Sequence, residues 1–562
     1  MSRITQRPVS ESICQQLEQA GIHPVLARIL AARGILGKEA VENTFSHLIP
    51  PHLMLNLDKA ANLLADAIID RKKMTVIADY DCDGATACAV AVQGIRMLGG
   101  NIDYIVPNRF DNGYGLTPAI SELAFREHQT DILITVDNGI ASIEGVARAN
   151  ELGMQVLVTD HHLPGEHIPR DCIIVNPNQK GCPFPSKNLA GVGVIFYILL
   201  GLRAEMRRRN RFSQETQPHL DTLLDLVALG TVSDIVPLDH NNRILVSQGL
   251  QRIRNGITRP GIAALFRIAG RNQQKASSDD LGFAIGPRIN AAGRLSDMTI
   301  GVECLLSQDM ETAMRFAREL DTFNLDRQRL ESSMKQDALA KTANLNPADH
   351  YTICIASGNW HQGVIGLLAA RIREHYYRPT IVFTEDDHGN LQGSGRSIPH
   401  LHIRDALAQI AERFPGIILK FGGHAMAAGL TIPKNTFHQF CETFEQLSRK
   451  QLSPEQLEPV TETDGSLATR YLTEDFVALL GSQTWGMGFP SPLFYDEFTV
   501  KRQRVLKNAH LKLLLERDGR LYEAIQFQNS TLLPDTVKLA YRPVLNTFNN
   551  RTTIQLTIET VE

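Results

Sequence analysis

The sequence lacks the features that mark several broad classes of protein. None of its eight cysteines stands in a Cys-x-x-Cys pair, which argues against a zinc knuckle and a disulfide scaffold and favours a reducing, cytoplasmic setting. The longest apolar stretch, 191–202, is too short to cross a bilayer and predicts a buried helix. The N-terminus has no apolar segment of the kind found in signal peptides. We therefore expect a protein without membrane segments.

An excess of basic residues is also absent. Lys and Arg total 57 against 61 for Asp and Glu, which gives a formal net charge of −4. A protein that coats duplex DNA by releasing counterions would be basic overall. Any polyanion that this chain handles must therefore meet local basic patches, or metal ions held by acidic side chains. The 562 residues, 43% of them hydrophobic, are enough for about three or four domains and exclude wholesale disorder.

The order of apolar patterns predicts an α/β protein with a β-rich end. Between about 70 and 180, short β-rich runs alternate with helical stretches, which predicts a parallel sheet covered by helices on both faces. Charged and apolar residues at helical spacing over 309–345 predict a long helix that joins two lobes. Short alternating strands after about 460 predict a small barrel. The expected segments are helical 1–65, parallel-sheet 66–255, connecting helical 256–345, smaller α/β 346–450, and barrel 458–562, with a linker over 450–459.

Acidic residues follow three strands of the predicted sheet. They are Asp79, Asp81 and Asp83 after the first strand, Asp137 after another, and Asp160-His161-His162 after a third. Because ligands of open α/β sheets bind outside the carboxyl ends of the strands, we expect these side chains to converge in one crevice. A lone aspartate at a strand end is commonly a helix cap or a turn residue. Three such groups at successive strand ends favour a shared site instead.

The chemistry of these side chains favours a site for divalent cations. Asp79, Asp81 and Asp83 alternate, so in an extended segment they would point to one side and repel each other unless a cation neutralises them. Carboxylates with one or two imidazoles suit Mg²⁺ or Mn²⁺. Two such ions would activate a water and stabilise both oxygens of a phosphoryl displacement.

These segments resemble the first three motifs of the DHH phosphoesterase superfamily. Segments 230–237 (with Asp234), 286–294, 360–366, 393–397 and 422–429 are similar to motifs of the RecJ family of single-strand-specific 5′→3′ DNA exonucleases. The resemblance is dense over 50–450 and weaker beyond. It implies a DHH domain and a smaller DHHA1 domain joined by the long helix and completed by an OB-fold barrel. The lobes and barrel would form a passage too narrow for a duplex.

The resemblance also implies roles for individual residues. Two ions, Mn²⁺ or Mg²⁺, would lie between Asp79, Asp81, Asp83, Asp137, His161 and Asp234, with Asp137 as the bridge. Some relatives have a histidine where this chain has Ile77, so either Asp79 takes its place or the first ion binds more weakly. The catalytic group would comprise His162 as substrate contact or acid, Asp160 as the residue that orients a histidine, and His424 facing the metals from the second lobe.

Five further residues would bind the substrate by the same resemblance. Arg109, Ser394 and Arg396 would grip a phosphate near the 5′ end, because the guanidinium fork can donate two hydrogen bonds to phosphate. Arg288 and Asn290 would contact the strand backbone. Taken alone, Arg109 is equally a surface ion-pair residue, and a buried structural histidine is the alternative for His424.

The resulting expectation is a single-stranded-DNA exonuclease that releases mononucleotides in DNA repair and recombination. Single-stranded DNA is the expected partner, a single-strand-binding protein and a helicase are expected by resemblance, and a monomer is expected. Two alternatives stay open. One is a DHH-family phosphodiesterase acting on short oligonucleotides or cyclic dinucleotides, although such enzymes are typically shorter and lack the third domain. The other is a catalytically inactive single-strand DNA-binding scaffold, which should have lost the metal ligands.

Overall fold

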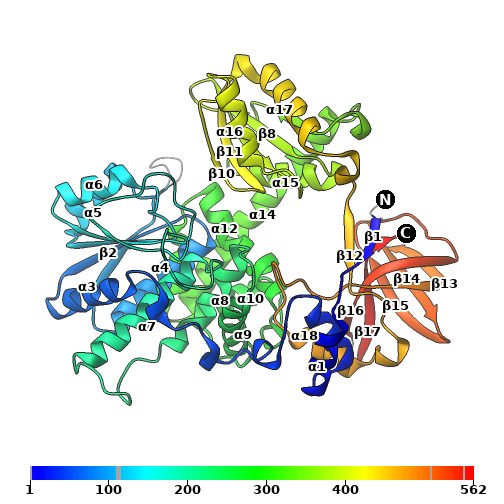
Figure 1. Cartoon of the computed structure of the whole chain (residues 1–562), viewed down its shortest axis with the longest axis horizontal. Helices are drawn as coiled ribbons and strands as arrows, with labels where there is room; N and C mark the ends of the chain where they lie inside the picture. Colours follow the sequence, from blue (N-terminus) through cyan, green and yellow to red (C-terminus); the bar gives the residue numbers. More distant parts are fainter. Residues whose placement is uncertain (1–2, 109–114, 507–508, 549–550) are drawn as a thin grey trace.

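The computed structural model describes residues 3–108, 115–506, 509–548 and 551–562. Figure 1 shows three bodies: a first lobe with an attached helical region, a second lobe above it, and a barrel at the side, where both chain ends lie. The predicted fold class is confirmed, since a parallel-sheet lobe, a smaller α/β lobe and a closed barrel are all present.

The first lobe is built on a five-stranded parallel sheet in the order β3-β2-β4-β5-β6. Its strands are β2 (Lys73–Ala78), β3 (Asn101–Ile105), β4 (Ile132–Val136), β5 (Gln155–Thr159) and β6 (Ile173–Val175). Ala78 is level with Val136, and Val136 is level with Thr159. The residues that follow these three positions therefore leave the sheet side by side at its carboxyl edge.

Helices cover both faces of this sheet. Met74 and Val76 point into a core shared with α3 (Leu57–Ile69), α4 (Cys82–Met97), α7 (Gly191–Arg208) and α8 (Leu224–Ser233). Ile77 points to the other face and packs with α5 (Pro118–His128) and α6 (Ile143–Glu151). The alternation follows from the two-residue period of a strand. The apolar stretch 191–202 forms the first part of α7 and is almost entirely buried.

A helical region leads from the first lobe to the second. It contains α9 (His240–Arg254), α10 (Pro260–Ile268), α11 (Ser278–Asp280), a π-helical turn η6 (Leu281–Ile285), α12 (Gly286–Leu295) and α13 (Thr299–Leu306). The long helix expected over 309–345 is α14 (Met310–Lys341), and Asp309 caps it by accepting a hydrogen bond of 2.8 Å from the Thr312 amide. Figure 1 shows α14 rising toward the second lobe.

The second lobe contains a mixed sheet in the order β10-β11-β9-β8-β7. Its strands are β7 (Ile353–Ala356), β8 (Thr380–Glu385), β9 (Asn390–Arg396), β10 (Lys420–Gly423) and β11 (Ala427–Pro433), with β7 and β8 parallel and the other neighbours antiparallel. Its helices are α15 (Ile365–Tyr376), α16 (Ile403–Arg413) and α17 (Phe437–Gln451).

The C-terminal barrel is closed in the order β13-β14-β15-β17-β16. Its strands are β13 (Phe494–Leu506), β14 (His510–Arg517), β15 (Arg520–Gln526), β16 (Thr536–Phe548) and β17 (Arg551–Val561), preceded by α18 (Glu474–Ser482). The sequence pattern did not indicate β13. Only its first half alternates between buried and exposed residues, and the second half, which contains Lys501, Arg502 and Arg504, is largely exposed.

The N-terminal segment, expected to be helical over 1–65, contains a short strand ahead of its helices. Strand β1 (Arg3–Gln6) pairs in parallel with β12 (Val460–Thr463), ahead of α1 (Glu11–Gln19) and α2 (Pro24–Ala31). The Arg33 guanidinium lies 2.6 Å from the Asp464 carboxylate in a buried ion pair. The expected linker over 450–459 is largely ordered, because α17 runs to Gln451 and a 3₁₀ turn spans Pro454–Leu457. In the described ranges, no helix combines the length and the apolar character needed to cross a membrane.

Candidate metal centre

The acidic residues predicted from the strand ends do converge at the carboxyl edge of the first sheet. Three sets of side chains each bring their ligand-type atoms within 4.8 Å of one another. The sets are Asp79, Asp81 and Asp137; Asp83, His161 and Asp234; and Asp137, His161 and His162. All six side chains expected to be metal ligands belong to these sets, and Asp137 and His161 belong to two sets each.

Backbone amides at two helix N-termini orient the carboxylates of Asp81 and Asp83. Asp81 caps α4, since its Oδ1 accepts a hydrogen bond of 3.0 Å from the Gly84 amide. Asp83 accepts hydrogen bonds of 2.6 and 3.0 Å from the amides of Gly191 and Val192, the first residues of α7. A helix N-terminus favours negative charge, so α7 stabilises the Asp83 carboxylate. A Cβ at position 191 would lie 2.5 Å from the Asp137 Cβ, so only glycine fits this close approach.

The centre of the site holds three buried polar atoms that lack hydrogen-bond partners. They are Asp137 Oδ1, His161 Nε2 and Asp234 Oδ2. His161 Nε2 lies 3.1 Å from the Asp137 oxygen and 3.5 Å from the Asp234 oxygen. Asp137 also has a left-handed backbone, with φ of 61°. Buried polar atoms are nearly always paired, so the three converging atoms fit a divalent cation, which would satisfy all of them.

The charges around these atoms support the same interpretation. Burial and the neighbouring Asp81 raise the pKa of Asp83 to about 7. Burial and nearby carboxylates, Asp83 above all, raise the pKa of Asp137 and of Asp234 well above their ordinary range. Burial and the adjacent His162 lower the pKa of His161 to about 4, which keeps its imidazole neutral, as a metal ligand must be. The raised pKa values of the three aspartates reflect repulsion between their carboxylates, which a bound cation would offset.

Asp160 holds His162 beside this cluster. Its carboxylate accepts hydrogen bonds of 2.7 to 3.1 Å from the amides of Ile140, His161 and His162, and it lies 2.8 Å from His162 Nδ1. Burial disfavours the charge on both side chains, but their hydrogen bond outweighs it. That bond lowers the pKa of Asp160 and raises the pKa of His162 to about 9. Asp160 thus fixes the orientation of a protonated His162.

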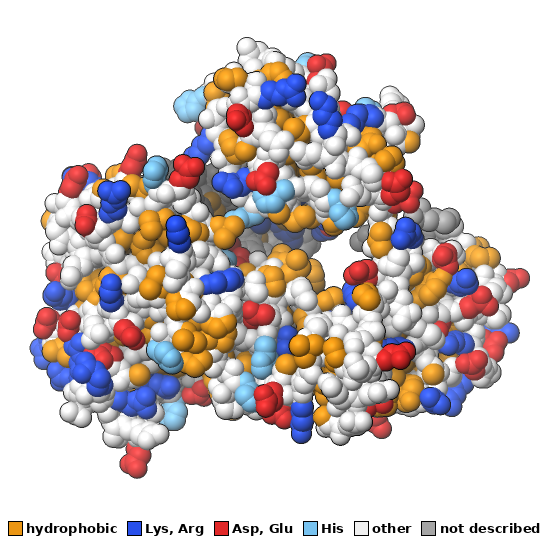
Figure 2. Space-filling model, in the orientation of Figure 1, with side chains coloured by type: hydrophobic (Ala, Val, Ile, Leu, Met, Phe, Trp, Pro, Cys, Tyr) orange, Lys and Arg blue, Asp and Glu red, His pale blue; other side chains and the backbone are white. Residues whose placement is uncertain are grey.

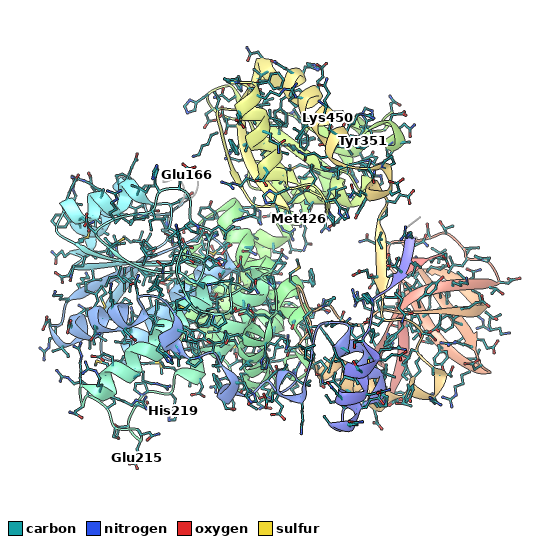
Figure 3. All side chains as sticks on the ribbon, in the orientation of Figure 1. Glu166, Glu215, His219, Tyr351, Met426 and Lys450 are labelled. Carbon is teal, nitrogen blue, oxygen red and sulfur yellow. The ribbon has the colours of Figure 1, made fainter. Side chains whose placement is uncertain are left out.

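The second lobe contributes His424 to the same place. Its ring centroid lies 6.4 Å from that of His162, and the two ring planes differ by 23°. Burial and the charge of His162 lower the pKa of His424. Figure 3 labels Met426, two residues further on, at the side of the second lobe that faces the first. The turn between β10 and β11 therefore reaches across to the first lobe.

The residues expected to bind substrate are placed differently from one another. Arg396 Nη1 donates to Ser394 Oγ at 3.2 Å and to the Gly395 carbonyl at 2.8 Å, and the described residues contain no carboxylate paired with this guanidinium. Arg288 Nε pairs at 2.9 Å with Asp321 of α14. Asn290 Oδ1 accepts a hydrogen bond of 2.7 Å from the Cys82 amide. Arg109 lies outside the described residues.

Two features of the site were not foreseen from the sequence. One is the support of Asp83 by the start of α7, and the other is the bond that ties Asn290 to the turn between Asp81 and Asp83. Gly191, at the start of the apolar stretch 191–202, is the sequence feature that could have indicated the contact between Asp83 and α7. Ile77, where some relatives have histidine, is fully buried in the core beneath α5 and α6, whereas Asp79 belongs to a ligand set with Asp81 and Asp137.

We expect Asn290→Ala to weaken metal binding more than DNA binding. The substitution frees the Cys82 amide and so loosens the turn that carries Asp81 and Asp83. Loss of a group that orients metal ligands costs about 10- to 100-fold in metal affinity or activity. Titration calorimetry with Mn²⁺ would measure the change. An unaltered Mn²⁺ affinity together with weaker single-strand binding would instead favour the direct contact that the sequence suggested.

Three sequence models of known domains match the chain. They are described as the DHH family N-terminal domain over residues 73–231, the DHHA1 domain over 349–450, and the RecJ OB domain over 463–560. The first match spans the parallel sheet with its acidic strand ends, and the third spans the closed barrel.

Whole proteins are similar to this chain along nearly their full length. The single-stranded-DNA-specific exonuclease RecJ of Haemophilus influenzae is 46% identical over 96% of both chains, and that of Escherichia coli is 43% identical over 96% of both. Among solved structures, RecJ of Thermus thermophilus in complex with Mn²⁺ superposes with a TM-score of 0.83 at 27% identity, over 100% of this chain and 79% of that one. The same protein has also been solved in complex with Mg²⁺.

Proposed function

Because the chain belongs to the RecJ family of single-stranded-DNA-specific exonucleases, we propose that it hydrolyses single-stranded DNA from the 5′ end and releases mononucleotides. It is a metal-dependent hydrolase whose cofactor is Mn²⁺ or Mg²⁺. The observation that carries the proposal is the convergence of Asp137 Oδ1, His161 Nε2 and Asp234 Oδ2, buried and without hydrogen-bond partners.

The six ligand residues would hold two ions between them. When bound, such ions supply Lewis-acid activation of a water and neutralise the charge that develops on the phosphate. Asp137, which belongs to two of the three sets, would serve both ions; Asp79 and Asp81 share one set with it, and Asp83 and Asp234 share another set with His161. The backbone amides of α7 keep the Asp83 carboxylate in place, and the Asn290–Cys82 bond keeps the turn that bears Asp81 in place.

His162 would handle the proton of the reaction. With its pKa raised to about 9, its ring carries a proton at neutral pH, and because Asp160 contacts Nδ1, Nε2 is the ring nitrogen on the side away from Asp160. From that position it would donate a hydrogen bond or a proton to a phosphate oxygen or to the leaving group. His424 would bind the same phosphate from the other lobe, so the two lobes would close on the scissile bond together.

Arg396 and Ser394 would hold the terminal phosphate. Arg396 is surrounded by Ser394 and the start of α15, where a Cβ at Gly366 would lie 3.0 Å from its Nη2. We expect Arg396→Ala to lower kcat/KM on a 5′-phosphorylated oligonucleotide by about 10- to 100-fold, the value of one or two charge-assisted hydrogen bonds. The loss should be smaller on a 5′-hydroxyl oligonucleotide.

The matched control for this prediction is Arg413→Ala, an exposed arginine of α16 in the same lobe, which should leave both rates unchanged. Equal losses on the two kinds of 5′ end would argue against a phosphate role for Arg396.

Single-strand selectivity would follow from the shape of the molecule. Figure 2 shows an opening bounded by the two lobes and the barrel. We propose that a single strand passes along it to the metal centre and that a duplex is too wide to follow. A single-strand-binding protein and a helicase as further partners, a monomeric state and a cytoplasmic location belong to the same proposal. None of the eight cysteines forms a disulfide, which supports the last point.

The two alternative functions make different predictions. A phosphodiesterase for short oligonucleotides or cyclic dinucleotides would typically lack the C-terminal barrel. An inactive scaffold would be expected to have lost some of the metal ligands. The test is digestion of end-labelled single-stranded DNA, duplex DNA, RNA and a cyclic dinucleotide, with and without Mn²⁺. Mn²⁺-dependent release of mononucleotides from the 5′ end of single-stranded DNA is expected. Preference for the cyclic dinucleotide, or binding without cleavage, would contradict the proposal.

A further inference from the structure

Several of the most exposed apolar side chains belong to segments that carry or contact the metal centre. Among the described residues, the large hydrophobic side chains with the highest exposed fractions are Phe283 at 81%, Ile235 at 67%, Leu36 at 66% and Leu163 at 64%. Ile235 follows the metal-centre residue Asp234 directly, and Leu163 follows His162. Exposed apolar groups that cluster at one place mark a binding surface, whereas scattered ones need no explanation.

Phe283 comes from another segment, and that segment contacts the helix that leads to Asp234. It lies on the π-helical turn η6, which packs against the end of α8: a Cβ at Gly282 would lie 3.2 Å from Val232 Cγ1, and one at Gly286 would lie 2.3 Å from Ser233 Oγ. Asp234 and Ile235 are the next two residues after this contact. The helix then continues as α12 to Asn290, which bonds to Cys82. Single π-helical turns often occur at functional sites.

The backbone at Ile235 is strained in a way that keeps its side chain exposed. Its φ is 61°, in the left-handed region, which a β-branched residue rarely occupies. Isoleucine is less stable than glycine in this conformation. Folding alone would favour glycine or asparagine at this position, so the isoleucine side chain points to a role other than stability.

We propose that Phe283, Ile235 and Leu163 form an apolar platform that holds the unpaired bases of the substrate strand while the metal centre holds its phosphates. This rests on the proposed function. Bases in a single strand present flat apolar faces, which stack on aromatic and aliphatic side chains without regard to sequence. In a duplex those faces are covered by the neighbouring base pairs and cannot contact the protein. The platform therefore adds a chemical preference for single strands to the steric one.

The test compares two 5′-phosphorylated oligonucleotides of equal length, one normal and one whose second to fifth nucleotides are abasic. With the normal strand, Phe283→Ala should raise KM about tenfold and leave kcat within about twofold, since stacking is worth about 1–3 kcal/mol per base. With the abasic strand, the wild type and Phe283→Ala should have the same, raised KM. Phe283→Trp should restore a low KM on the normal strand.

Ile235→Gly separates binding from folding. The glycine relieves the left-handed strain, so the melting temperature should stay equal or rise, while KM on the normal strand should rise severalfold. Leu36→Ala is the matched control, because Leu36 is equally exposed but lies in the loop after α2; its kinetics should equal those of the wild type.

The outcomes distinguish this proposal from the one on which it rests. A wild type that cleaves neither strand would contradict the proposed function itself. An active wild type with an unchanged KM in Phe283→Ala would overturn the platform alone. So would a fall in kcat of equal size on both strands accompanied by a lower melting temperature, because that pattern indicates a structural residue.

Discussion

Asp137→Asn will reduce exonuclease turnover by on the order of 10³-fold while single-strand binding changes little. The carboxylate takes part in two of the three ligand sets, so its loss weakens the hold on both ions at once. Metal ions stabilise the charge of such a transition state by several kcal/mol, and each 1.36 kcal/mol is about tenfold in rate. Asparagine tolerates the left-handed backbone that Asp137 adopts, so the fold should persist.

The control for this substitution is Asp171→Asn. Asp171 also has a left-handed backbone, with φ of 54°, but it is exposed and lies two residues before β6. The two variants thus make the same chemical change in the same backbone conformation. Single-turnover kinetics with saturating Mn²⁺ would measure the rates. Turnover of Asp137→Asn within tenfold of the wild type would remove the basis of the metal assignment.

Removal of divalent cations will abolish activity and lower the melting temperature, by an amount that grows with pH. The folded-state pKa of Asp83, about 7, lies above the value of 3.8 expected in the unfolded chain. Between these values the folded, metal-free protein binds more protons than the unfolded one, so its free energy of unfolding falls as the pH rises. The raised pKa values of Asp137 and Asp234 act in the same direction.

Mn²⁺ at about 100 times its dissociation constant adds about 2.7 kcal/mol of stability. We therefore expect Mn²⁺ to raise the melting temperature by several degrees at pH 8 and by less at pH 5.5, where protons compete for the same oxygens. Differential scanning calorimetry at the two pH values, with chelator or with Mn²⁺, would measure both effects. If Mn²⁺ raised the melting temperature equally at both pH values, the inferred repulsion between Asp83, Asp137 and Asp234 would be contradicted.

The sequence was sufficient for the part of the site that lies on one sheet. Level strand ends follow from the parallel pairing, so Asp79, Asp137 and Asp160 had to meet once the strands were recognised. Asp234 and His424 come from other elements, and only the motifs of a known family brought them in. Their approach depends on how α8 and the second lobe pack, which no local pattern encodes.

The features that escaped prediction depend on contacts between segments far apart in the chain. The bond between Asn290 and Cys82 spans 208 positions. The exposure of Phe283 and Ile235 could not be foreseen either, because an isolated hydrophobic residue in a sequence is normally assigned to the core. Strand β13 was missed because the charged side chains of its second half hide the two-residue period.

The pairing of β1 with β12 has a consequence for how the molecule is made. As the chain leaves the ribosome, residues 3–6 and the buried Arg33 emerge early, whereas their partners at 460–464 emerge hundreds of residues later. Domains generally fold during synthesis in order from the N-terminus. The contacts of β1 and Arg33 can therefore form only after residues 460–464 have been made.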